Sequence, residues 1–125
     1  MLTEKISIYV PGTIDKDSPA GDVQLEQVRH IMASLSGLFG GATTIGGEGA
    51  WVDDEGELIC EPVRIVSSFT DSATLREKRD NVYALCRQLC NDMSQDCVTL
   101  EIDGGMDFID NKTSELESLI SQLTK

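Results

Sequence analysis

A cluster of glycines in residues 37–49 constrains the fold of this 125-residue chain more than any other feature. Its members are Gly37, Gly40, Gly41, Gly46, Gly47 and Gly49. A phosphate-binding loop places its glycines after a strand and before a helix, where backbone N–H groups and the positive end of the helix dipole meet the anion. Here a helical pattern precedes the glycines and a strand pattern follows them, so the polarity is reversed. The glycines are therefore predicted to shape the backbone and not to bind a phosphate.

The residues on either side of the cluster predict a helix that ends in glycine and a strand that leads into a hairpin. Val28, Ile31 and Leu35 recur at spacings of three and four, which is the pattern of an apolar helix face. Gly40 or Gly41 supplies the left-handed residue that commonly ends a helix. The later glycines predict a bulge or the close approach of another chain within the strand, and residues 53–56 predict its turn.

Periodicity predicts an α+β protein with the split βαβ, or ferredoxin-like, plan. Ile6, Ile8 and Val10 alternate with more polar residues, as in a half-buried strand. The predicted elements are strand 5–10, a helix that follows Asp22 and ends at the glycines, strand 42–52, strand 57–69, helix 71–93, strand 97–103 and helix 112–125. Asp22 is expected to cap the first helix, and Asp71 or Ser72 the second. The order βαββαβ places two helices on one face of a four-stranded antiparallel sheet. We expect a single domain over residues 1–125, with a core over 1–111 and a short amphipathic C-terminal helix over 112–125.

The charge balance narrows the classes of partner. Ten Lys and Arg residues stand against 22 Asp and Glu residues, for a formal net charge of −12. Binding to DNA or RNA needs clustered cations, so no direct nucleic-acid binding is expected. A negative surface attracts basic proteins, although acidity can also serve solubility alone. The sequence has no run of eighteen apolar residues and carries Glu4 near its start, so we expect no membrane span, no secretory leader and a cytoplasmic location.

The residue types that carry catalysis are sparse. The four cysteines lack the paired spacing of a zinc site, and Cys86 is predicted to be a small residue of the core. His30, the single histidine, lies off the apolar helix face, so no Ser-His-Asp set or Cys-His pair is visible. We predict no catalytic residue, no metal site and no cofactor.

Two surfaces are candidates for binding. The sheet face opposite the helices is predicted to carry Tyr9, Trp51, Arg64 and Glu101. The C-terminal helix carries an apolar stripe, and four buried aliphatic side chains would stabilise a contact by about 6 kcal/mol. The stripe, a candidate interface within the chain or with a second copy, consists of Leu116, Leu119, Ile120 and Leu123.

Four short motifs run along the chain: "YVP" at residues 9–11, "FGGAT" at 39–43, "GAW" at 49–51 and "LEIDG" at 100–104. In these motifs the chain resembles a family of short uncharacterised proteins from bacteria, archaea, phages and plasmids. The resemblance covers most of residues 5–110 and implies the same fold plan and an association with mobile genetic elements. It implies no catalytic residues. The segment Gly104-Gly105-Met106-Asp107 departs from the family, whose members are shorter and more aromatic here.

Together these observations favour a small acidic protein-binding module without enzymatic activity. Its expected role is an inhibitor, encoded by a mobile element, that occupies the basic nucleic-acid-binding surface of a host protein. One alternative is a small-molecule-binding protein or enzyme that uses the open sheet face of a dimeric α+β barrel. A second alternative is a homodimeric structural or interaction protein.

Overall fold

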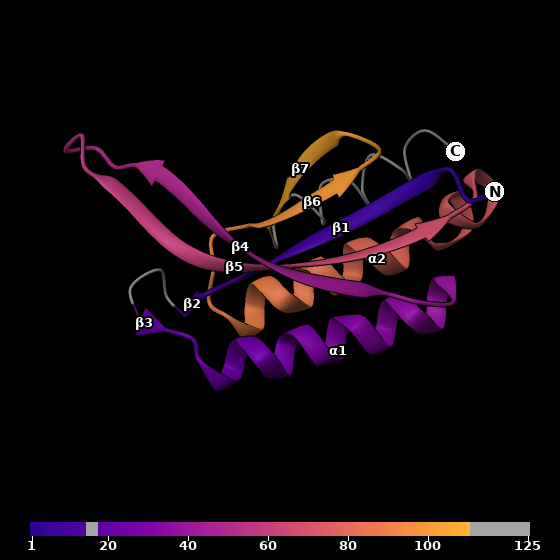
Figure 1. Ribbon diagram of the computed structural model, residues 1–125, viewed down its shortest axis with the longest axis horizontal. Helices are drawn as coiled ribbons and strands as arrows, with labels where there is room; N and C mark the ends of the chain where they lie inside the picture. The colour runs from indigo at the N-terminus through magenta and orange to yellow at the C-terminus, as the bar shows by residue number, and fades with distance from the viewer. Residues whose placement is uncertain (15–17, 111–125) are drawn as a thin grey trace, which may run out of the picture.

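The computed structural model describes residues 1–14 and 18–110 and shows an antiparallel sheet with both helices against one face (Figure 1). The elements are β1 (Glu4–Pro11), β2 (Thr13–Ile14), β3 (Ser18–Pro19), α1 (Asp22–Phe39), β4 (Thr43–Val52), β5 (Leu58–Thr70), α2 (Ser72–Asp92), β6 (Val98–Ile102) and β7 (Gly105–Ile109). The main sheet has five strands in the order β4-β5-β1-β6-β7, and β2 pairs with β3 in a separate two-stranded sheet.

The predicted α+β class is confirmed, but the prediction of four strands is wrong by one. The additional strand, β7, covers a segment to which the sequence pattern assigned no element. Asp103 and Gly104 both have positive φ and turn the chain back from β6 into β7. Phe108 then lies opposite Thr99 in the β6–β7 pairing. The predicted C-terminal helix over 112–125, with its stripe at Leu116, Leu119, Ile120 and Leu123, lies outside the described residues.

The hydrophobic core lies between the helices and the sheet. Ile6, Ile8 and Val10 of β1 are fully buried, because β1 is the central strand of the sheet and its inner face meets both helices. From α1 the buried residues are the three predicted ones, Val28, Ile31 and Leu35. Neither described helix combines the length and the apolar character that a membrane-spanning segment requires.

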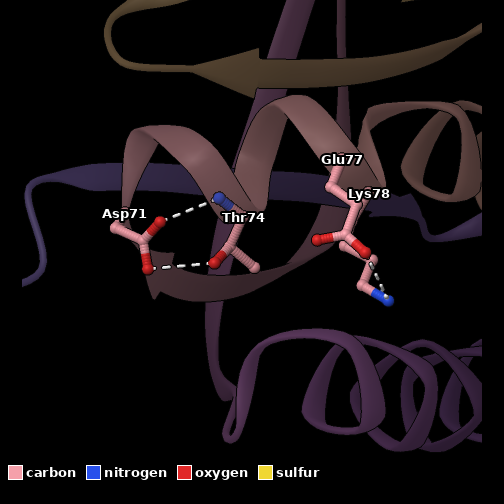
Figure 2. Close-up of polar contacts among 4 residues, drawn as sticks. All are labelled: Asp71, Thr74, Glu77 and Lys78. Carbon is pink, nitrogen blue, oxygen red and sulfur yellow. Dashed lines mark hydrogen bonds and ion pairs between the residues drawn. The ribbon is translucent and has the colours of Figure 1, made fainter.

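The start of α2 and the end of α1 follow the capping signals in the sequence, whereas the predicted Asp22 cap is wrong. Asp22 lies in the first turn of α1, and the N-cap is Gly21, which has no side chain to accept a hydrogen bond. Asp71 precedes α2, and its carboxylate accepts hydrogen bonds from the Thr74 backbone N–H at 2.8 Å and the Thr74 hydroxyl at 2.9 Å (Figure 2). These bonds lower the pKa of Asp71 below its ordinary value. Gly40 ends α1 with φ of 93° and donates its N–H to the Ser36 carbonyl at 2.8 Å. The nearby pair Glu77–Lys78, 3.9 Å apart and solvent-accessible, adds little stability (Figure 2).

The β4–β5 hairpin extends past the ends of the helices (Figure 1). Its pairing is unbroken from Thr43–Ser67 to Val52–Leu58, so the predicted bulge at Gly46–Gly49 is absent. Strand β1 pairs with β5 only as far as Pro11–Val63, and Pro62 lies just beyond that point. A proline donates no hydrogen bond, so it is tolerated where β5 has a neighbour on one side only. Beyond Pro62 the hairpin is a two-stranded ribbon.

Candidate functional site

One face of the sheet carries no described helix, and we call it the open face. Residues directly opposite each other in an antiparallel pair point to the same side. Tyr9 lies on the open face, because its neighbours Ile8 and Val10 are buried on the helix side. Ile65 of β5 opposes Tyr9, and Ile45 of β4 opposes Ile65, so every second residue of β4 and β5 counted from these two also lies on the open face. Several large apolar side chains remain exposed there, which is typical of a binding surface. They are Ile45, Trp51, Phe69, Met106 and Phe108.

A cleft of about 430 Å³ opens on this face, between the β4–β5 hairpin and the β6–β7 hairpin. This volume lies within the usual range of small-molecule sites. The lining residues are Tyr9, Pro11, Gly47, Glu48, Gly49, Ala50, Trp51, Glu61, Val63, Ile65, Gln95, Cys97, Val98, Thr99 and Phe108. Apolar and aromatic groups thus surround a few polar ones, which is the usual composition of a ligand site.

Two glycines of β4 create the space. Along the open face of β4, Ile45 and Trp51 are separated by Gly47 and Gly49, which have no side chains. A Cβ added at Gly49 would meet no heavy atom within 4 Å, and one at Gly47 would make only an ordinary contact with Val63 at 3.5 Å. Packing within the chain therefore does not require glycine at either position, and both leave volume open to the cleft.

Tyr9 is held at the cleft by Glu101. The Tyr9 hydroxyl donates to Glu101 Oε1 at 2.9 Å, from the central strand to its neighbour β6. This hydrogen bond, followed by partial burial, raises the pKa of Tyr9 above 10.0. The phenol therefore stays protonated at neutral pH, where it donates a hydrogen bond and does not act as a base.

Glu61 is the carboxylate of β5 that lines the cleft, and Thr13 of β2 holds it in place. The Thr13 hydroxyl donates to Glu61 Oε2 at 3.0 Å, and Gln95 Nε2 donates to the Thr13 carbonyl at 2.8 Å. Gly12 can pack against β5 only because it has no side chain: a Cβ at this position would lie 2.1 Å from the Pro62 carbonyl oxygen. Glycine at position 12 thus lets Thr13 come within hydrogen-bond distance of Glu61.

The structure brings together three of the four residues predicted for this face. Tyr9 and Trp51 line the cleft, and Glu101 contacts Tyr9. The predicted placement of Arg64 on this face is wrong. It opposes Val10 and Gly46 in the register, so it lies on the helix side of the sheet. The apolar residues Val63 and Ile65 on either side of it face the open side instead, where the sequence pattern predicts polar residues.

Three features of the cleft are absent from the sequence-based predictions. The sequence pattern predicts only that Glu61 belongs to a strand, although its alternation with Val63 and Ile65 along β5 assigns it to the same face. Phe108 was missed because β7 was not predicted, yet Met106 and Phe108 alternate as a strand requires. The glycines of β4 were recognised as a shape feature, but their location on the ligand-facing side could not be derived without the register.

Over residues 1–14 and 18–110, no group of three or more His, Cys, Asp or Glu side chains is arranged to hold a metal ion. Cys97 is exposed and lines the cleft, whereas Cys86 is buried in the core. Burial raises the pKa of Cys86 to about 12, so its thiol remains protonated and unreactive.

No family model and no curated protein matches the chain. Solved structures of similar fold include a phage SAM lyase in the apo state, with a TM-score of 0.65 and 21% identity over 86% of this chain and 89% of that one. A phage SAM lyase in complex with S-methyl-5'-thioadenosine matches with a TM-score of 0.59 and 21% identity, over 85% and 88% of the two chains. The chain therefore shares its fold with a catalytic protein. This finding contradicts the expectations of a non-catalytic protein-binding module and of no enzymatic activity.

Proposed function

We propose that the chain is a lyase that binds S-adenosylmethionine in the open-face cleft and releases S-methyl-5'-thioadenosine. The observation that carries the proposal is the cleft, which is lined by Gly47 and Gly49 and by the aromatic side chains of Trp51 and Phe108. The chain that forms it shares the fold of a SAM lyase over most of its length. The phage origin of these neighbours also supports an association with mobile elements. The expectation of a macromolecular partner stays untested.

The lining chemistry matches the two ends of such a substrate. An adenine ring is flat and stacks on aromatic side chains, and Trp51 presents an exposed indole at the cleft. The sulfonium and the amino group are cationic, and Glu61 supplies a carboxylate whose position Thr13 fixes. The net charge of −12 adds a long-range attraction for a cationic ligand.

The reaction needs little from the protein in the form of acid or base. When the bond between sulfur and the γ-carbon of the substrate breaks, its electron pair passes to sulfur and neutralises the sulfonium. A carboxylate oxygen of the same substrate forms the new bond to that carbon, so a lactone is the second product and no proton is transferred. A cleft that holds the substrate in the reactive conformation and excludes water therefore contributes most of the catalysis. The Tyr9 hydroxyl gives its proton to Glu101, so it presents a phenolic oxygen at a fixed position that can accept a hydrogen bond from the bound substrate.

The fold of this proposed enzyme is assigned to the split βαβ plan with one addition. Strands β4, β5, β1 and β6 follow the neighbour order of that plan, and α1 and α2 form its two connections. On this assignment β7 is an added edge strand, and it supplies Phe108 to the cleft.

The test is to incubate the purified full chain with S-adenosylmethionine and to measure S-methyl-5'-thioadenosine by mass spectrometry. Gly49→Leu fills the cleft and is expected to lower turnover by about 100-fold, because the substrate can no longer reach its productive position. Gly46→Leu is the matched control, since Gly46 points to the opposite side of the same strand. Product formation no faster than the spontaneous decay of the substrate would refute the proposal.

A second measurement addresses the charge of the substrate. Glu61→Gln is expected to weaken binding of S-adenosylmethionine by about tenfold, the scale of one charge-assisted hydrogen bond. Binding of the uncharged thioether product should change much less. Equal losses for both ligands would show that Glu61 does not recognise the cation.

A further inference from the structure

A second cavity lies on the helix side of the sheet, between α2 and the β6–β7 hairpin. It has a volume of about 320 Å³ and does not share a residue with the open-face cleft. Its polar residues are Arg79 and Tyr83 of α2 and Asp107 of β7, and its apolar residues include Leu100 and Ile102 of β6. A cation, a carboxylate and an aliphatic surface are thus combined in one small cavity.

The Tyr83 hydroxyl stands between the two charges. It accepts a hydrogen bond from Arg79 Nη2 at 3.1 Å and donates one to Asp107 Oδ2 at 3.0 Å. The Arg79 guanidinium also lies over the Tyr83 ring, 5.4 Å from its centroid. Burial raises the pKa of Tyr83, so its hydroxyl keeps its proton. Among the described residues Arg79 and Asp107 form no ion pair with each other or with any other side chain.

This spacing differs from that of a structural ion pair. If the contact served only to join α2 to β7, a direct bond between the guanidinium and the carboxylate would be the stronger connection. With the hydroxyl in between, Arg79 keeps N–H donors and Asp107 keeps a carboxylate oxygen for other groups. Leu100 is almost fully buried and Ile102 half-buried beneath them, so the apolar floor is rigid.

We propose that this cavity binds a free α-amino acid with an aliphatic side chain. Its carboxylate would bind Arg79, its ammonium group would bind Asp107, and its side chain would lie against Leu100 and Ile102. A zwitterion satisfies both charges at once, whereas a simple amine or a simple carboxylate leaves one of them without a partner. The site lies on the opposite side of the sheet from the cleft and stands whether or not the chain is a lyase.

The experiment is a titration of the ¹³C-methyl-labelled full chain with L-leucine, followed by NMR at the Ile102 and Leu100 methyl groups. We expect saturable shifts with a Kd of about 1 mM, which is ordinary for so small a ligand. Isopentylamine and 4-methylpentanoate carry the same aliphatic group with one charge each. Each is expected to bind at least about tenfold more weakly, because one charge-assisted contact is lost.

Variants assign the two contacts. Arg79→Gln and Asp107→Asn should each weaken binding of L-leucine by about tenfold or more. The controls Arg76→Gln and Asp80→Asn change exposed charges of α2 outside the cavity and should leave the titration unchanged. The absence of saturable shifts, equal binding by the one-charge analogues, or full binding by Arg79→Gln or Asp107→Asn would each overturn the proposal.

Discussion

The two faces of the central sheet use the same strands for different purposes. On β1, Ile8 is fully buried against the helices, while its neighbour Tyr9 faces the cleft and hydrogen-bonds Glu101. The helix side holds tightly packed aliphatic residues, whereas the open face leaves large apolar groups such as Trp51 and Phe108 in contact with solvent. Residues that secure the fold and residues available for a ligand thus alternate one by one along a strand. Substitutions at adjacent positions should therefore separate stability from binding.

The largest expected effect is on the helix side. Ile8→Ala removes a fully buried side chain and should lower the free energy of unfolding by about 3 to 4 kcal/mol. Ile45→Ala makes the same chemical change on the open face, where Ile45 is 58% exposed, and should cost within about 0.5 kcal/mol. Urea unfolding followed by circular dichroism compares the two. Similar losses would show that the open face is covered in solution and would break the contrast between the faces.

The next effect is on ligand binding. Trp51→Ala should weaken binding of S-methyl-5'-thioadenosine by about tenfold to 100-fold, which corresponds to about 1 to 3 kcal/mol for the loss of one stacked base. Its free energy of unfolding should change little, because the indole is partly exposed on a two-stranded ribbon. Val52→Ala is the control, since Val52 is the next residue and points to the other side. Calorimetric titration measures both variants, and equal affinities would remove Trp51 from the site.

The contrast also explains how far the sequence alone could reach. Elements with a single buried face were predicted well: the β1 alternation, the α1 stripe that ends at Gly40, and the Asp71 cap all follow local rules. Arg64 was misplaced because β5 is apolar on the side away from the helices, and the usual rule of apolar inside and polar outside therefore gives the wrong face. The fifth strand leaves only a short local signal, the alternation of Met106 and Phe108. The cleft also depends on strand register, which is a long-range feature that no local pattern encodes.

Thiol reactivity offers a smaller but site-specific measure of the same contrast. Cys97 lines the cleft, Cys60 is exposed outside it, and Cys86 is buried. Maleimide should label Cys60 and Cys97 but not Cys86, whose pKa of about 12 keeps its thiol protonated. S-Methyl-5'-thioadenosine at about ten times its Kd should slow labelling of Cys97 by about tenfold and leave Cys60 unaffected. Protection of both thiols or of neither, read by peptide mass spectrometry, would place the ligand elsewhere.

The smallest expected effect concerns the Tyr9–Glu101 hydrogen bond, which links the two strands beside the cleft. Because the pKa of Tyr9 is raised in the folded chain, the folded state holds the phenolic proton more tightly than the unfolded state does. The stabilisation is therefore fully present below pH 10 and is lost as the pH rises through the folded-state pKa.

In Tyr9→Phe this part of the pH dependence should disappear. The free energy of unfolding of the unsubstituted chain should fall more steeply than that of Tyr9→Phe from pH 10 upward, while below pH 9 their difference should stay constant at about 1 kcal/mol. Urea titrations between pH 7 and pH 11 measure both curves. Parallel curves over the whole range would mean that the phenol and Glu101 are not hydrogen-bonded in solution. Tyr9 would then be free to rotate into the cleft, and its role as a fixed acceptor for the substrate would have to be abandoned.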